Sequence, residues 1–103
     1  MDVFGAMANP TRRELLGLLR DGGTQPVQQL AEHFDMQRPS LSEHLKVLLD
    51  AGLVAERKAG RQRLYTLVPE PLQEVAEWLS PYERFWRGRL TALRELLDEQ
   101  ADG

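Results

Sequence analysis

The spacing of apolar residues predicts helices in the first half of the chain. Asn9 is a good capping residue, and Pro10 suits the first position of a helix. The leucines within residues 15–19 then form an apolar face, and the glycines at 22 and 23 end the pattern. We therefore expect a helix over about residues 10–20, preceded by a short helix over about residues 2–8.

A second pair of helical patterns follows. The apolar positions after Pro26 fit a two-turn helix that ends near Phe34. Leu41, Leu45 and Leu48 lie on one stripe of the next helix, which starts at about Gln37 and ends before a glycine at position 52. Two helices joined by so short a connection predict a helix-turn-helix over about residues 26–51.

The period of the pattern changes after Gly52. Residues 53–58 and 61–68 are short runs of strand-forming residues on either side of Ala59 and Gly60. They predict a β-hairpin, or wing, over about residues 53–68. Its tip is basic, with more charge than the protection of an exposed strand edge requires, so we expect phosphate contacts there. The basic residues are Arg57, Lys58, Arg61 and Arg63.

Helical patterns return in about residues 70–98. A helix over 70–79 is followed by Ser80-Pro81-Tyr82-Glu83, which has the form of a capping box and starts a longer helix. The apolar face of that last helix is too wide for one small neighbour, so we expect it to pair with its copy in a second chain. The residues expected at the dimer interface are Val3, Phe4, Met7, Tyr82, Phe85, Trp86, Leu90, Leu93 and Leu97.

The aromatic residues near this last helix admit a second interpretation. Trp78, Tyr82, Phe85 and Trp86 are also suited to line a site for a small molecule or another protein. Their helical spacing, on a helix that needs a partner, favours the dimer core instead.

Length and composition limit the class of protein. The 103 residues hold one domain, so we predict a single, mainly α fold over residues 1–103 with a small β-hairpin, in the order α-α-α-α-β-β-α, dimerising through its first and last helices. The sequence has no cysteine, which excludes disulfides, thiolate metal sites and cysteine nucleophiles. It shows neither a signal peptide nor an apolar run of about 18 residues, so we expect a cytoplasmic protein with no membrane partner.

The distribution of charge matters more than its total. A net charge of −3 argues weakly against a nucleic-acid partner. Residues 38–63, however, carry six basic against three acidic residues, whereas residues 1–37 carry three against five and residues 64–103 carry four against eight. The basic charge therefore coincides with the predicted helix-turn-helix and wing, which favours a nucleic-acid partner.

Three stretches of the chain resemble a known family. They are Asn9-Pro-Thr-Arg-Arg-Glu-Leu-Leu, Gln29-Leu-Ala-Glu-His-Phe, and the run RPSLSEHLKVLLDAGLV that begins at Arg38. Together they are similar to the ArsR/SmtB family of winged helix-turn-helix repressors, over roughly residues 3–97, and the Tyr-x-x-Phe-Trp pattern from Tyr82 resembles a cysteine-free subgroup. The resemblance implies a dimer built from the first and last helices, a recognition helix in the major groove of DNA, and a wing along the DNA backbone.

A helical wheel of residues 37–51 gives the same orientation without the resemblance. With the leucine stripe facing inward, short hydroxyls and one arginine face outward near the start of the helix, and such groups can reach base edges. We expect base contacts from Arg38, Ser40, Ser42 and Glu43. Residues expected to support the helix or contact phosphate are Gln37, His44 and Lys46. Arg12 and Arg13 are also candidates: one is expected to contact phosphate and the other to pair with an acid such as Glu14, and the sequence does not say which.

Metal binding and catalysis find little support. The last helix carries carboxylates but no histidine, and His33 and His44 lie on the helix-turn-helix pair, so we expect no metal and no cofactor. Carboxylates at a dimer interface leave weak metal binding open. The serines lie on the recognition helix or in a cap and no glycine-rich phosphate loop follows a strand, so we expect no enzyme.

These observations predict a sequence-specific transcriptional regulator, a homodimeric repressor on a pseudo-palindromic operator in double-stranded DNA. The alternative is a winged-helix module that acts mainly through a protein partner, with weak DNA binding; Glu43 and the overall acidity favour it. The sequence leaves open whether a small molecule or a co-expressed protein is the effector, and whether the protein represses or activates.

Overall fold

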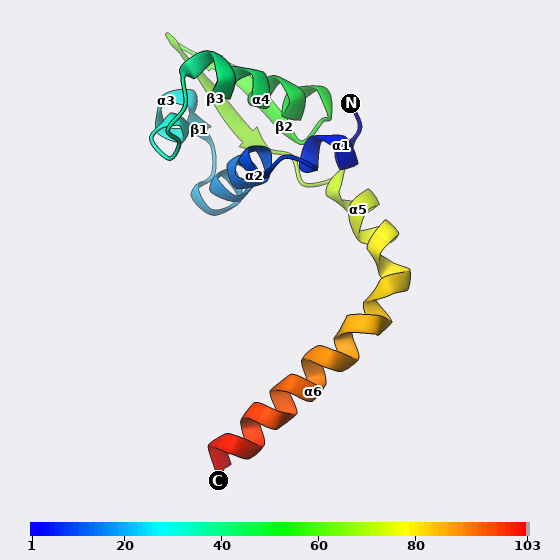
Figure 1. Ribbon diagram of the computed structural model, residues 1–103. Coiled ribbons are helices and arrows are strands. Elements are labelled where there is room, and N and C mark those ends of the chain that lie inside the picture. Colours follow the sequence, from blue (N-terminus) through cyan, green and yellow to red (C-terminus); the bar gives the residue numbers. More distant parts are fainter. Residues whose placement is uncertain (103) are drawn as a thin grey trace.

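A computed structural model describes residues 1–102, with the side chains of all of them except Leu90, Ala101 and Asp102. Four helices and a small sheet form a body, and the two C-terminal helices lead away from it as an arm (Figure 1). The elements are α1 (Val3–Met7), α2 (Pro10–Gly22), β1 (Gln25–Pro26), α3 (Val27–Ala31), α4 (Arg38–Asp50), β2 (Val54–Ala59), β3 (Gln62–Leu67), α5 (Leu72–Leu79), the 3₁₀ turn η1 (Ser80–Tyr82) and α6 (Glu83–Asp102). The predicted mainly α fold with a hairpin is confirmed.

The start and end of α2 follow from local chemistry. The Asn9 side-chain oxygen accepts hydrogen bonds from the backbone N–H groups of Thr11 (2.8 Å) and Arg12 (3.2 Å), which have no partner inside the helix. Gly23 ends the helix with a φ of 72°, a conformation that favours glycine. Both features are as predicted.

The sheet has one more strand than the predicted hairpin. Its order is β1-β3-β2, all antiparallel, and Pro26 of β1 lies opposite Leu64 of β3. A proline is tolerated there because β1 is an edge strand. The buried side chain of Gln25 donates to the carbonyls of Leu18 (2.8 Å) and Gly23 (3.1 Å), so it fixes the loop after α2 against the sheet. Two residues are too few to show a strand pattern, which is why the sequence did not predict β1.

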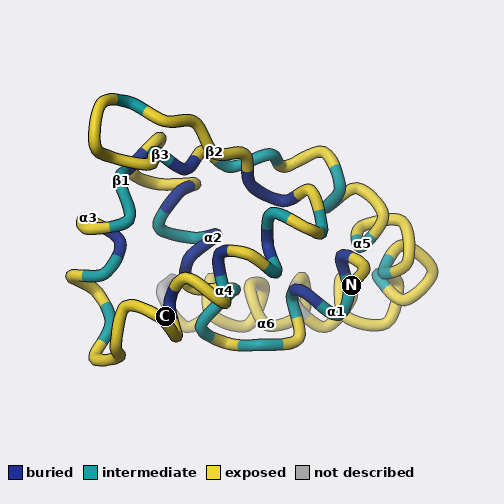
Figure 2. The backbone as a smooth tube through the Cα atoms, turned by 90° about the horizontal axis from the view of Figure 1, so that it is seen from above, coloured by how far each residue is buried: buried dark blue, intermediate teal, exposed yellow. Residues whose placement is uncertain are grey.

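The core lies between α2, α3, α4 and the sheet (Figure 2). The predicted stripe of Leu41, Leu45 and Leu48 is at most 1% exposed. Each such leucine contributes roughly 1.5–3 kcal/mol by its removal from water. The stripe therefore fixes which face of α4 points outward.

Two predicted helix boundaries were wrong. α3 ends at Ala31 instead of near Phe34, because the chain continues in turns that lead to α4. The capping box at Ser80 does not form, because Ser80 has helical dihedrals (φ −50°, ψ −46°) and its backbone N–H donates to the carbonyl of Ala76 in α5. An N-cap residue needs an extended conformation, so α5 passes through η1 into α6 without a new start.

The arm gives the molecule an elongated shape. Its radius of gyration is 18.0 Å, against about 13 Å for a compact domain of this size. No helix in the described part of the chain has both the length and the apolar character needed to span a membrane.

Candidate nucleic-acid interface

The first turns of α4 are open to solvent. Gln37 precedes the helix in an extended conformation, and its side chain makes no capping hydrogen bond. The predicted base-contacting residues are all exposed on the first turns of the helix. They are Arg38, Ser40, Ser42 and Glu43. Lys46 is also exposed, whereas His44 is half-buried and His33 is exposed on the segment after α3.

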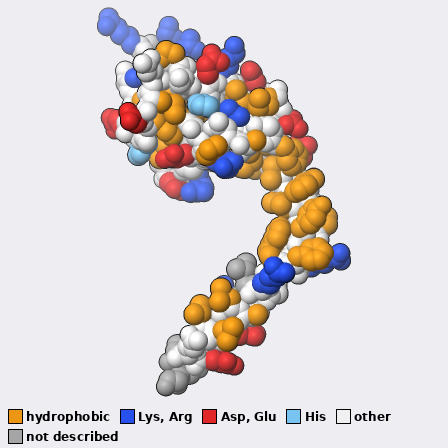
Figure 3. All heavy atoms as spheres, in the orientation of Figure 1, with side chains coloured by type: hydrophobic (Ala, Val, Ile, Leu, Met, Phe, Trp, Pro, Cys, Tyr) orange, Lys and Arg blue, Asp and Glu red, His pale blue; other side chains and the backbone are white. Residues whose placement is uncertain are grey.

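The wing places basic side chains directly opposite one another. Lys58 of β2 pairs with Arg63 of β3 in the strand register, and like charges in such a position repel. One carboxylate offsets this, because Arg63 Nη1 lies 3.2 Å from Glu56 Oε1. Arg57, Lys58 and Arg61 make no ion pair with the described side chains. Basic side chains project from this tip in Figure 3, at the end of the body far from α6.

A cleft lies between the β2–β3 hairpin and the start of α4. It has a volume of about 230 Å³, and its lining brings the first residue of α4 together with two wing arginines. Gln62 Nε2 donates to Gln28 Oε1 (3.1 Å), which ties the wing tip to α3. The residues that line the cleft are Pro26, Val27, Gln28, Arg38, Arg61, Gln62 and Arg63. Three arginines line this one cleft, and arginine side chains are suited to bind a phosphate group.

The sequence did not point to Gln28 or Gln62. Their place at the cleft follows from the packing of the wing against α3 and β1, and an exposed glutamine carries no periodic signal. The basic charge of the neighbouring residues was the one sequence signal for this region.

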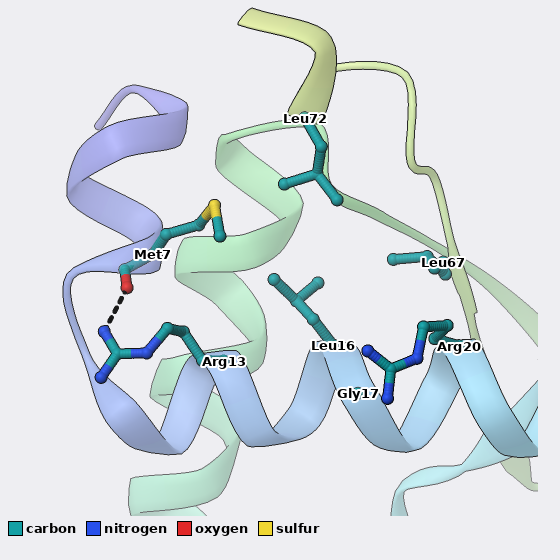
Figure 4. Close-up of a pocket in the computed structure, with 7 residues that line it drawn as sticks. All are labelled: Met7, Arg13, Leu16, Gly17, Arg20, Leu67 and Leu72. Carbon is teal, nitrogen blue, oxygen red and sulfur yellow. Dashed lines mark hydrogen bonds between the residues drawn. The ribbon is translucent and has the colours of Figure 1, made fainter. Parts of the chain in front are cut away.

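Arg12 and Arg13 both bind the end of α1. Arg12 donates to the carbonyls of Ala6 (Nε, 2.7 Å) and Gly5 (Nη2, 3.2 Å), and Arg13 Nη1 donates to the carbonyl of Met7 (2.6 Å; Figure 4). Neither forms an ion pair with Glu14 among the described contacts, so the expected acid pairing was wrong. The Gly5 carbonyl also accepts from the backbone N–H of Ala8 (3.2 Å), and the carbonyls at the end of α1 carry partial negative charge, which favours guanidinium groups.

A second, apolar surface covers α1, α5 and α6. Phe4 and Trp78 meet edge to face with ring centroids 6.2 Å apart, and Trp78 lies 5.2 Å from Tyr82. Hydrophobic side chains then continue along the arm (Figure 3), where Phe85 is 58% and Leu97 57% exposed. Contiguous apolar surface of this kind marks an interaction site.

The predicted dimer-interface residues divide into three groups. Tyr82, Phe85, Trp86, Leu93 and Leu97 are exposed, and Phe4 and Met7 are half-buried next to them. Val3 is only 4% exposed because it packs into the core of its own chain, so its assignment to the interface was wrong. The side chain of Leu90 lies outside the described residues.

A small apolar pocket opens beside this surface, between α1, α2, β3 and α5 (Figure 4). Met7, Leu16, Leu67 and Leu72 line it, with Gly17, and Arg13 and Arg20 lie at its side. Its volume of about 180 Å³ is below the roughly 300–1,000 Å³ of typical ligand pockets. It suits one or two protein side chains better than an organic ligand.

Among the described residues, no three histidine, aspartate or glutamate side chains gather as metal ligands.

Comparisons with known proteins agree with this arrangement. Residues 7–57 match a family model described as a helix-turn-helix domain. The chain is 37% identical over 78 residues to the transcriptional repressor SdpR of Bacillus subtilis, which covers 76% of this chain and 86% of the relative. It is 39% identical over 100 residues to the HTH-type transcriptional regulator Rv2034 of Mycobacterium tuberculosis, which covers 97% of this chain and 90% of the relative.

A solved structure decides the family. A crystal structure described as an ArsR family transcriptional regulator superposes with a TM-score of 0.71 at 39% identity, covering 82% of this chain and 86% of the other. The chain belongs to the ArsR/SmtB-type family of winged helix-turn-helix regulators. In this ArsR-family regulator α3 and α4 are the two helices in the predicted helix-turn-helix region, and β2 and β3 form the hairpin that follows. It is a DNA-binding transcriptional regulator, and the names of its relatives do not favour the alternative of a module that acts mainly on proteins.

Proposed function

We propose that this ArsR-family regulator is a homodimeric repressor that binds a pseudo-palindromic operator. The observation that carries the proposal is the cleft in which Arg38 of the recognition helix meets Arg61 and Arg63 of the wing. It makes one continuous basic surface from the helix that enters the major groove and the hairpin beside it.

The roles within that surface follow from position. Arg38, Ser40, Ser42 and Glu43 lie on the exposed first turns of α4 and read base edges. Gln37 and Lys46 flank this face and contact the backbone. The wing residues Arg57, Lys58, Arg61 and Arg63 bind phosphates, and a phosphate beside Lys58 and Arg63 relieves the repulsion between these two side chains.

The dimer is proposed from the second surface. In α6 the side chains of Leu93, Leu96 and Leu97 are more than half exposed. Such a helix is stabilised when a second copy covers it, and two identical surfaces favour a two-fold dimer. Such a dimer places two recognition helices about 34 Å apart, one turn of DNA, which requires an operator with two-fold symmetry.

Fluorescence anisotropy tests the proposal. The purified protein is titrated into a labelled duplex from the region upstream of its own gene and into a scrambled duplex of equal length, each at two salt concentrations. We expect tighter binding to the upstream duplex by at least about 10³-fold, and affinity that falls steeply with salt. Equal, weak binding to both duplexes would count against the proposal.

A further inference from the structure

One side chain connects the first helix to the recognition helix. The guanidinium of Arg12, on α2, donates to the carbonyls of Ala6 (2.7 Å) and Gly5 (3.2 Å) at the end of α1. On its other side, Arg12 Nη1 lies 3.2 Å from His44 Nδ1 on α4. Three helices that are separate in the sequence therefore meet at a single arginine.

This contact fixes the hydrogen on the imidazole of His44. Arginine is always a donor, so Nδ1 of His44 is the acceptor and the ring hydrogen is on Nε2. Nε2 makes no hydrogen bond among the described residues. In the part of the chain that the structure describes, every buried side-chain nitrogen has a hydrogen-bond partner, so the unpaired Nε2 of the half-buried His44 is not itself buried. The Nε2–H group of His44 thus reaches the solvent as a donor.

The position of His44 on the helix shows where that donor lies. Ser40 is exposed on the DNA-facing turn of α4, and His44 comes one turn later on the same side, four residues along. A donor at this distance from the base-reading turn suits an oxygen of the DNA backbone.

We propose that Arg12 is a positioning residue that holds His44 as an Nε2–H donor to a DNA phosphate and ties this donor to the end of α1. The inference rests on the proposed DNA binding and adds a link to it. Because α1 borders the apolar surface of the proposed dimer, a shift of α1 reaches the recognition helix through Arg12.

The neighbouring arginine provides a matched control. Arg13 has the same charge and donates to the same end of α1, at the carbonyl of Met7, but it makes no contact with α4 among the described hydrogen bonds. A purely structural role in holding α1 applies to both arginines, whereas a role toward DNA through His44 applies to Arg12 alone.

Nuclear magnetic resonance of the imidazole nitrogens tests the first step in the full chain without DNA. Spectra are recorded at about pH 8, where an ordinary imidazole is neutral, and the His44 signals are assigned with His44→Gln. We expect the Nε2–H tautomer in the wild type and in Arg13→Lys. In Arg12→Lys we expect a mixture of tautomers, because one ammonium group does not satisfy three acceptors in different directions. An Nδ1–H tautomer in the wild type, or an unchanged His44 in folded Arg12→Lys, would overturn the proposal.

A double-mutant cycle on DNA tests the second step. Arg12→Lys and His44→Ala are each expected to weaken operator binding about tenfold. The double variant is expected to bind the operator no more weakly than the single variant with the lower affinity. Arg13→Lys is expected to stay within about twofold. Reductions in affinity that multiply, or an unchanged affinity in His44→Ala, would refute the proposal. If the wild type itself shows no specific DNA binding, both the proposed function and the phosphate contact of His44 are refuted. The tautomer spectrum decides separately whether Arg12 positions His44.

Discussion

Lys58 lies directly across the wing from Arg63, and Glu56 offsets only one of these two charges. A like-charged pair on adjacent strands lowers stability. The phosphate contact proposed for the wing offsets this cost when DNA is bound.

Lys58→Thr is expected to separate these two effects. Removal of one charge leaves the free energy of unfolding unchanged or raises it by up to about 0.5 kcal/mol, since threonine suits a strand. Binding to operator and scrambled DNA is expected to weaken equally, and the salt slope to fall by about one per chain. Urea unfolding and anisotropy at several salt concentrations measure both. A weakening confined to the operator would mean that Lys58 reads sequence.

Ser42→Ala and Arg38→Ala are expected to act on specificity. Each removes a side chain that is proposed to read a base, so operator binding is expected to weaken by about 1–3 kcal/mol and binding to scrambled DNA to change little. Arg61→Ala is the control, because removal of a phosphate-binding group weakens both duplexes alike. Equal weakening on both duplexes for Arg38→Ala would instead assign Arg38 to the phosphate cleft that it shares with the wing.

Leu97→Ser is expected to weaken the dimer without unfolding the chain. The side chain is 57% exposed in one chain, so its replacement costs little inside the protomer. Light scattering after size exclusion is expected to give a dimer for the wild type and a lower mass for the variant at the same concentration. Leu45→Ala is the contrasting change: Leu45 is 1% exposed, and its truncation is expected to lower the free energy of unfolding by about 2–5 kcal/mol. A monomeric wild type at every concentration would contradict the dimer.

Asn9→Ala is expected to lower the stability of the protein, whereas Ser80→Ala is expected to change it little. The Asn9 side chain caps α2 with two hydrogen bonds, and its removal is expected to cost about 0.5–2 kcal/mol. Ser80 has helical dihedrals and continues the helix instead of capping it, so Ser80→Ala is expected to stay within about 0.5 kcal/mol. Thermal unfolding of both variants measures the difference, and an equal, large destabilisation at Ser80 would indicate a cap that the structure does not show.

The sequence predicted best where one local pattern decides the outcome. The leucine stripe of α4 and the Asn9-Pro10 start of α2 each depend on near neighbours, and both were correct. The capping box at Ser80 failed although its motif was complete, because helical geometry continues through the turn and leaves no cap position. A motif describes what a residue can do, and the backbone around it decides whether it does so.

Contacts between distant segments were not predictable in the same way. Strand β1 exists because Gln25 and Pro26 pair with β3, some forty residues later in the sequence. Arg12 has the carbonyls of α1 and His44 as its partners instead of the acid that was one of the predicted alternatives. Val3 was assigned to a second chain because the pattern does not show which apolar residues the chain's own core takes up.

In vitro selection from random DNA duplexes tests the central claim most directly. A homodimer that reads bases with α4 is expected to enrich one inverted repeat, with half-sites centred about 10–10.5 base pairs apart or at a multiple of that spacing. Selection with Arg38→Ala and Ser42→Ala is expected to relax that sequence at matching positions in both halves. Failure of the wild type to enrich any sequence over the starting library, under conditions where it is folded, would contradict the account.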